Sequence, residues 1–351
     1  MNATKHTFDI VPDEPYVYEF TDQDVVLDLH GISVMLNYER GATEPRFRHA
    51  KLIKVATTRD FETARGFQTI DQGDLAPRTG LLFGKYPPSS NEETVPDLPS
   101  NMLAQPVPPG LQHLTPKQLE TYYWQARNHE GCYDAIALFQ YFIDLFPAST
   151  RLRVRSVKND SPKEYYCLAD ARTIHEFELT DQLSLNMVSV LPERVTYISG
   201  LGHSNCHAVL GFAPPGRGPY FPETVLDLAS LQFGEAGRGF KGRGTFVLED
   251  TEEYVSRLAT FSRAHNFEDS TRSERINEAN IRDNVWLVTL AVKVKERWDN
   301  RQFVPWCDHC GAPPSLGHRL LRCSQCKQAY YCDAEHQLSA WPFHRHFCQT
   351  I

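Results

Sequence analysis

The spacing of apolar residues in the first part of the chain predicts strands and turns. Short apolar runs, among them Tyr16–Tyr18 and Val25–Leu29, are separated by turn signals such as Gly31 and Gly41. Short runs bounded by glycine in this way are typical of β-strands. We therefore expect residues 1–86 to form a β-rich N-terminal region.

A proline-rich stretch and two helices follow. Residues 87–114 are rich in proline and show no apolar period, so we expect them to form an extended connector. Thr115 can cap a helix that has Pro116 at its first position, and Gln118 can complete the capping box. A second helix is predicted to begin at Cys132, because apolar residues recur after it at steps of three and four.

Residues 115–270 are predicted to form an α+β domain. The two helices are followed by β-type segments, which Gly- and Pro-rich turns separate: Leu152–Val157, Val195–Ile198, Cys206–Phe212 and Thr224–Leu228. Helices followed by several strands are typical of α+β folds. A linking helix is expected within residues 271–300, with Ile281, Val285, Val288 and Val292 along one apolar face.

Length and composition indicate a folded protein of more than one unit. The chain has 351 residues, of which 41% are hydrophobic and 23% are charged, close to the globular average. Its net charge of −8 gives no general attraction to nucleic acid or to an anionic membrane, so we expect neither as a partner. The first residues contain no leader-like pattern, and the longest apolar run, Val285–Val292, is too short to span a bilayer. These features predict a cytoplasmic or nuclear location.

Cysteine is concentrated near the carboxyl end. Six of the nine cysteines lie in residues 307–348, whereas Cys132, Cys167 and Cys206 are scattered. Dense Cys and His in a protein of a reducing compartment indicate metal binding rather than disulfides. Eight possible ligands fall into four pairs, and two tetrahedral zinc ions need eight. They are Cys307, Cys310, Cys323, Cys326, Cys332, His336, His344 and Cys348.

Three further histidines lie in the same segment. His309, His318 and His346 do not complete the paired spacing, so we interpret them as surface or packing residues. His346 is the alternative to His344 as a ligand. Cysteines that pack without a metal are a second interpretation, but four evenly built pairs argue against it.

The segment 307–348 resembles a MYND finger. The resemblance rests on the ligand order, on Tyr331 before Cys332, on Gln337 directly after the sixth ligand, on Trp341 and on the His-x3-Cys ending. His336 stands where the family usually has cysteine, a change that zinc accepts. The resemblance implies two cross-braced zinc sites, one from Cys307, Cys310, Cys332 and His336, the other from Cys323, Cys326, His344 and Cys348. Metal binding would supply much of the folding free energy of so short a segment.

The family resemblance also implies a role in protein interaction. With two zinc ions bound the segment has a net charge near −1, which does not suit DNA. Related fingers bind short proline-containing peptides, and Gln337 and Trp341 would line the binding groove. An exposed Trp can stack on proline. The alternative is that Trp341 only covers the second zinc site.

Three residues of the larger domain resemble a catalytic set. Cys132 at a helix start, His207 in one strand and Asp227 in the next resemble the cysteine, histidine and aspartate of transglutaminase-like cysteine hydrolases. That resemblance implies that Cys132 attacks an amide, His207 moves the proton and Asp227 orients His207. Gln125 is a candidate oxyanion donor. The alternative is structural: a buried Cys132, a core His207 and an Asp227 that caps a turn.

The sequence thus predicts a zinc-binding adaptor, an α+β domain followed by a small two-zinc cross-braced finger that recruits a partner peptide. The rival prediction is a cysteine hydrolase or transferase that uses the finger for targeting. A SET-domain methyltransferase is disfavoured, because the letters of its Asn-His-Ser/Cys signature occur here only in another order, around His203–His207.

Overall fold

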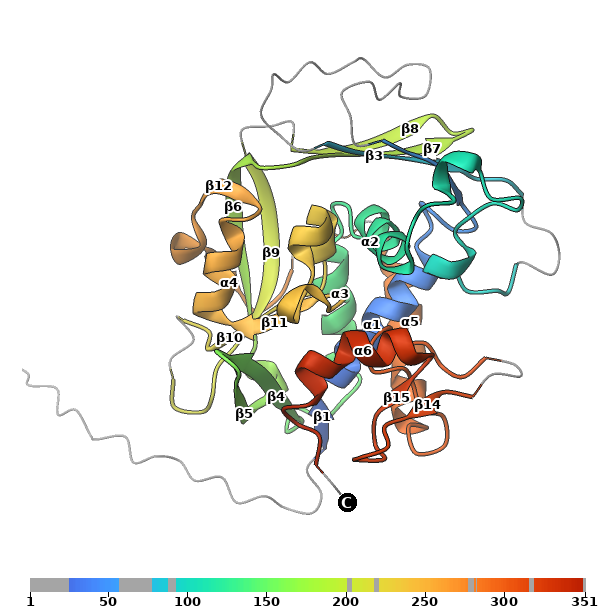
Figure 1. Cartoon of the computed structure of the whole chain (residues 1–351). Helices are drawn as coiled ribbons and strands as arrows, with labels where there is room; N and C mark the ends of the chain where they lie inside the picture. Colours follow the sequence, from blue (N-terminus) through green and yellow to red (C-terminus); the bar gives the residue numbers. More distant parts are fainter. Residues whose placement is uncertain are drawn as a thin grey trace, which may run out of the picture.

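The computed structural model of the protein describes residues 25–56, 78–87, 93–200, 204–217, 221–276, 281, 283–315 and 319–349. Within them, a large α+β body carries a small carboxyl-terminal finger on one side (Figure 1). The strand predicted at Tyr16–Tyr18 lies outside the described residues. Among the described residues, no helix combines the length and the apolar character needed to cross a bilayer.

A six-stranded sheet carries two of the predicted catalytic residues, His207 and Asp227. Its order is β11-β10-β9-β6-β12, with β13 also paired to β6, and all of these pairings are antiparallel. The strands are β6 (Thr173–Gln182), β9 (Ser204–Phe212), β10 (Thr224–Asp227), β11 (Val247–Asp250), β12 (Ser262–His265) and β13 (Thr271–Ser273).

Different helices cover the two faces of this sheet (Figure 1). Ala208 of β9 shares a core with α3 (Cys132–Ile143). The next residue, Val209, packs on the other side with Tyr254 of α4 (Thr251–Leu258). Successive strand residues point to opposite faces, and because both faces are covered here, β9 is buried without interruption from His207 to Phe212.

A four-stranded sheet packs against helix α2 (Pro116–Arg127). Its order is β2-β3-β7-β8, and β3 and β7 are parallel. The strands are β2 (Lys51–Ala56), β3 (Arg78–Gly84), β7 (Leu185–Leu191) and β8 (Val195–Ser199). The sheet therefore joins strands from the predicted N-terminal region to strands from the predicted α+β domain.

A three-stranded sheet and two long helices complete the body. The order β1-β4-β5 joins β1 (Val26–Asp28) to β4 (Arg151–Lys158) and β5 (Ser161–Leu168). Helices α1 (Leu29–Thr43) and α5 (Asn284–Asp299) pack with α3 in the largest hydrophobic core. In the described part of the proline-rich stretch there are two short turns, η1 (Pro99–Asn101) and η2 (Pro109–Leu111).

Several predicted elements are present. Helix α2 begins as expected, because the Thr115 hydroxyl accepts a hydrogen bond from the Gln118 N–H and the Gln118 side chain accepts from the Thr115 N–H. Helix α3 begins at Cys132. Helix α5 lies in the predicted linking segment, and the finger contains β14 (Leu321–Arg322), β15 (Tyr330–Tyr331) and α6 (Ala334–His344).

Two local predictions were wrong. Gly31 and Gly41 do not mark turns; both lie inside helix α1. Gly41 is needed for packing instead, since an added Cβ would lie 2.7 Å from the Trp124 ring. On α5, Val285, Val288 and Val292 are exposed, and the buried face consists of Leu287, Leu290, Ala291, Val294 and Trp298.

Candidate functional site

The four Cys/His pairs of the finger converge as two clusters. In the first, Cys307 and Cys310 follow α5 and meet Cys332 and His336 at the start of α6. The Cys307 Sγ lies 3.4 Å from the His336 Nδ1, and the sulfurs of Cys310 and Cys332 are 3.6 Å apart. The first and third pairs along the chain thus form one site.

The second cluster combines the second and fourth pairs. Cys323 and Cys326 flank a tight turn, and His344 and Cys348 lie at and just beyond the end of α6. The sulfurs of Cys323 and Cys348 are 3.8 Å apart, and the Cys326 Sγ lies 3.5 Å from the His344 Nε2. Interleaving of the pairs is the cross-braced arrangement that the family resemblance implied.

Both clusters have the dimensions of tetrahedral zinc sites. Within each cluster the ligand atoms all lie within 4.8 Å of one another. A tetrahedron with Zn–S bonds of about 2.3 Å has edges of about 3.8 Å, and Zn–N bonds shorten the mixed edges slightly. The donors, three thiolates and one imidazole in each cluster, are those that Zn²⁺ prefers. The two clusters fit two Zn²⁺ ions.

The competing histidines have other partners. The His309 Nε2 lies 2.8 Å from the Glu120 Oε1 of α2. The His346 ring contacts Phe240 and lies beside Asp160. His318 lies outside the described residues. His309 and Glu120 could form a third metal-binding group only by sharing His336 with the first cluster.

Helix α6 has an outer and an inner side. Leu338 and Trp341 are exposed by 65% and 39%, whereas Gln337 is partly buried. The Trp341 ring lies 6.0 Å from the ring of His344, so it borders the second cluster and also faces solvent. On the inner side, Ala340 and Phe343 line the junction with the large body.

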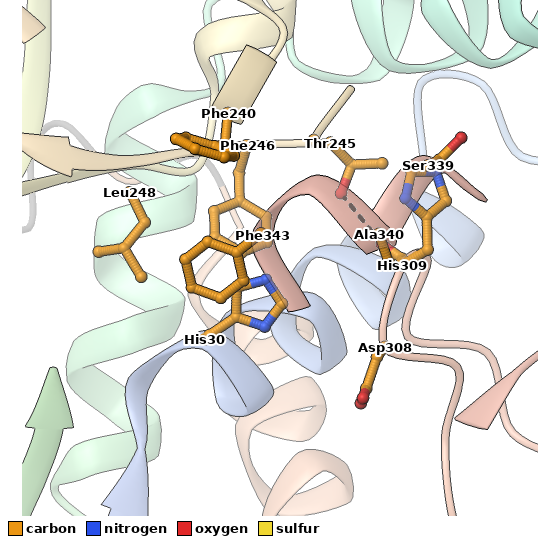
Figure 2. A pocket seen from close by; sticks show the side chains of 11 residues that line it. His30, Phe240, Thr245, Phe246, Leu248, Asp308, His309, Ser339, Ala340 and Phe343 are labelled. Carbon is orange, nitrogen blue, oxygen red and sulfur yellow. Dashed lines mark hydrogen bonds between the residues drawn. The ribbon is translucent and has the colours of Figure 1, made fainter. Parts of the chain in front are cut away.

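Phe343 fixes the finger to the body (Figure 2). Its ring stacks on His30 with the centroids 4.6 Å apart and meets Phe240 edge-on at 6.2 Å. The space left between the two parts is about 40 Å³, room for one or two waters and far below the size of a ligand pocket. The junction is therefore a packed interface.

Polar contacts reinforce the junction. Glu120 accepts from Arg238 at 2.7 Å as well as lying beside His309. Burial acts against its charge, but His309 and Arg238 lower the pKa of Glu120 to about 2. Gly311 has a φ of +78°, and an added Cβ there would lie 2.1 Å from the Val34 carbonyl oxygen. The finger backbone thus lies directly on α1.

A separate group of side chains meets at the start of α3. The Nε2 of His207 lies 2.8 Å from the Asp227 Oδ2, and both side chains are buried. The Tyr254 hydroxyl donates to the same oxygen at 3.0 Å, and the Ala229 N–H donates to Oδ1 at 3.0 Å. These contacts give the Asp227 carboxyl group a donor on both of its oxygens.

Cys132 influences the pKa of His207 in the same group. Burial disfavours the charged imidazole, but Asp227, and then Cys132 through hydrogen bonding and charge, raise the pKa of His207 to about 10. A cavity of about 230 Å³ lies beside Cys132. It is lined by Glu130, Tyr133, Asp134, Asn205, Cys206 and Gln232 in addition to Cys132. Of the three residues singled out in the sequence, Cys132 thus lines the cavity and interacts with the buried pair of His207 and Asp227.

Gln232 is a member of the site that the sequence did not indicate. Its Nε2 lies 3.2 Å from the His207 Nδ1, and its Oε1 accepts from the Glu130 N–H at 3.2 Å. Its position five residues after Asp227, in the turn that follows β10, is the signal that could have found it.

The remaining candidates have structural partners. The Gln125 Nε2 donates to the Asn186 Oδ1 at 2.6 Å, and Gln125 is not among the described residues that line the cavity beside Cys132. The Cys206 thiol lies 3.0 Å from the Tyr133 hydroxyl. Cys167 is buried in the core, and burial raises the pKa of its thiol to about 12.

Comparisons with known proteins concern the finger. Residues 307–348 match the family model of the MYND finger. Two curated relatives, each named histone-lysine N-methyltransferase SMYD3, are 48% identical (Mus musculus) and 46% identical (Homo sapiens) over 46 residues. That match covers 13% of this chain and 10% of each relative. No solved structure matches the chain. The carboxyl-terminal segment of this α+β protein, residues 307–348, is a MYND finger with sites for two zinc ions.

Proposed function

We propose that the chain is an adaptor whose MYND finger docks a short proline-containing peptide on the outer side of α6. The observation that carries this proposal is that the two sides of α6 differ in their contacts. Phe343 packs against His30 of the large body, whereas Leu338 and Trp341 face solvent. MYND fingers are protein-interaction modules, and a half-exposed indole offers a flat apolar surface to a proline ring. Bound zinc supplies the fold of the finger and takes no part in chemistry.

Trp341→Ala tests the docking surface. The full-length, zinc-loaded protein is applied to an array of proline-containing peptides, and the dissociation constant for the best ligand is measured by calorimetry. We expect Trp341→Ala to weaken binding about 30-fold, as loss of an aromatic anchor does. Phe303→Ala is the control, because Phe303 is 82% exposed but lies outside the finger. Equal affinities of wild type and Trp341→Ala would reject this site.

A second function is favoured by one observation, the meeting of Cys132, His207 and Asp227 beside a cavity. We propose that the large domain is a cysteine-dependent hydrolase or acyl transferase, for which the finger selects a partner. The Cys132 thiolate would attack a carbonyl carbon while the carbonyl electron pair moves to oxygen. His207 would protonate the leaving amine or alcohol as its bond breaks, which leaves a thioester on Cys132. Water or an amine, deprotonated by His207, would then release the acyl group and restore the thiolate.

Alkylation rates test the state of Cys132. The zinc-loaded protein is treated with iodoacetamide at pH 7, and each thiol is followed by peptide mass spectrometry. Cys206 is exposed, but burial of its sulfur and the nearby Cys132 raise its pKa. We expect Cys132 to react faster than Cys206, and His207→Ala to slow Cys132 about tenfold, because the thiolate loses its imidazolium partner. Faster reaction of Cys206, or no effect of His207→Ala, would contradict the enzyme.

Both proposed functions suit a reducing compartment, the cytoplasm or the nucleus. Zinc-binding thiolates and a nucleophilic thiol must remain reduced in order to work.

A further inference from the structure

We infer that Gln232 is the oxyanion donor of the Cys132 site, a role that rests on the proposed cysteine enzyme. Its amide nitrogen would donate a hydrogen bond to the carbonyl oxygen of the substrate as that oxygen becomes negative. Such donors are most effective when they are held in place beforehand in a site from which water is excluded. Gln232 is 3% exposed and lines the cavity beside Cys132.

The orientation of the Gln232 amide is fixed from behind. Its Oε1 accepts the Glu130 N–H at 3.2 Å, so the amide nitrogen must face the opposite way, toward His207. Glu130 has a φ of +50°, a backbone conformation that residues other than glycine seldom adopt. Residues held in such conformations cluster at active sites, where the surrounding structure maintains them. Glu130 lies two residues before Cys132, and its unusual backbone conformation directs its N–H toward the Gln232 side chain.

The main chain of Gln232 is held as well. Its N–H donates to the Ala229 carbonyl at 3.0 Å, and its carbonyl accepts from the Asn186 Nδ2 at 3.3 Å. Asn186 in turn accepts from Gln125 of α2. A donor supported on both sides is the arrangement that oxyanion stabilisation requires, because little reorganisation is needed during the reaction.

The contact with His207 indicates when the donor is free. An amide nitrogen can only donate, so the 3.2 Å contact with Nδ1 belongs to the neutral form of His207. In the imidazolium form, which the raised pKa of His207 favours at neutral pH, Nδ1 carries a proton and no longer accepts from the Gln232 amide. The amide hydrogens of Gln232 can then donate to a carbonyl oxygen in the cavity while the thiolate attacks the carbonyl carbon. The Cys132 N–H, in the first turn of α3, has no acceptor within the helix and is positioned to serve as the second donor.

Two reagents distinguish an oxyanion donor from a residue that only supports the thiolate. Iodoacetamide alkylates a thiolate by displacement and forms no oxyanion, whereas p-nitrophenyl acetate acylates it through a tetrahedral oxyanion. The full-length, zinc-loaded protein is used, and the rate measured with Cys132→Ala is subtracted. We expect Gln232→Met to lower the acylation rate about 100-fold, as loss of one oxyanion donor does, with little change in alkylation.

Gln140→Met is the matched control. Gln140 is also 3% exposed and also accepts a backbone N–H, that of Ile276 at 3.0 Å, but it does not line the cavity. We expect both of its rates to match the wild type. Gln232→Leu is the second variant, in case Gln232→Met does not fold, because a branched apolar side chain of similar volume also removes the donor without adding a charge. It should show the same selective loss.

Three outcomes would overturn the inference. Equal losses of acylation and alkylation would mean that Gln232 acts through the thiolate, and unchanged acylation would mean that it donates nothing to the oxyanion. If wild-type Cys132 reacts with neither reagent, the cysteine enzyme itself is rejected and the role of Gln232 with it. Only the third outcome touches the proposed enzyme, so the two failures are distinguishable.

Discussion

Among single residues, Asp227 decides the charge of the cysteine site. It is buried and accepts hydrogen bonds from His207, Tyr254 and the Ala229 backbone. Its carboxylate is the main favourable influence that raises the pKa of His207 to about 10 against the cost of burial. An unfolded His has a pKa of about 6.5, so the folded protein binds this proton more tightly than the unfolded chain does.

The stability of an Asp227→Asn variant should therefore depend on pH. The ionic contribution of His207 is complete below about pH 6.5 and is lost as the pH rises toward 10. We expect Asp227→Asn to lower the free energy of unfolding by about 3 kcal/mol at pH 6, with a smaller difference at pH 9. Urea unfolding at pH 6, 7, 8 and 9 measures this.

Asp170→Asn is the control for this pH series. The Asp170 side chain is 59% exposed and pairs with Arg172, which does not titrate in this range. Its effect on stability should be small and the same at every pH. A constant difference between wild type and Asp227→Asn from pH 6 to pH 9 would show that His207 is not charged in the folded state.

Residue patterns predicted only part of the two sites. The zinc ligands could be predicted because each pair is local in sequence and its spacing is set by zinc geometry. Cys132 could be placed at a helix start and His207 in a strand for similar local reasons. Gln232 could not, because it reaches His207 only when the turn after β10 folds back beneath Glu130. The interleaving of the zinc pairs came from family resemblance, since spacing alone does not specify it.

Among the elements, α1 and α5 show what local patterns miss. Gly41 suggested a turn, but its lack of a side chain allows Trp124 to approach the helix. On α5 two apolar stripes compete, and periodicity alone cannot say which one meets the core. The stripe that carries Trp298 and two leucines is buried, since it removes more apolar area from water than the three valines would.

A pair of valines on α5 tests this assignment. Val294 is fully buried and Val292, two residues away, is 43% exposed. We expect Val294→Ala to lower the free energy of unfolding by about 2 kcal/mol, because the lost methyl groups leave a cavity in the core. Val292→Ala should change it by no more than about 0.5 kcal/mol. Similar losses in the two variants, measured by urea unfolding, would show that the buried face is misassigned.

For the whole molecule, the main finding is that the finger and the body are packed together. The Phe343 ring lies on His30, His309 meets Glu120, and Gly311 touches the backbone of α1. The sequence predicted the finger and a helix before it, but not this junction. These contacts join residues more than a hundred positions apart, and the local spacing of residues in a single sequence cannot predict such contacts.

Removal of zinc should therefore affect the body as well as the finger. Chelation with 1,10-phenanthroline should release two Zn²⁺ per chain and unfold the finger, because metal binding stabilises its fold. We expect faster hydrogen exchange in α1 and α2, which lose the contacts with Gly311 and His309. Added zinc should restore protection. Unchanged exchange in both helices after zinc release would mean that the body does not depend on the finger.

The packing of Phe343 against His30 and Phe240 would also limit which partners the finger can bind. With the inner side of α6 held against the body, a peptide bound at Trp341, as we propose, would take up one fixed direction relative to the rest of the molecule. A finger on a flexible linker would bind any partner that carries the residues of the docking motif. Because the finger is packed against the body, the partner chain on either side of those residues would also have to pass the surface of the large domain without overlap. The shape of the partner beyond the proposed docking motif would thus become part of the recognition.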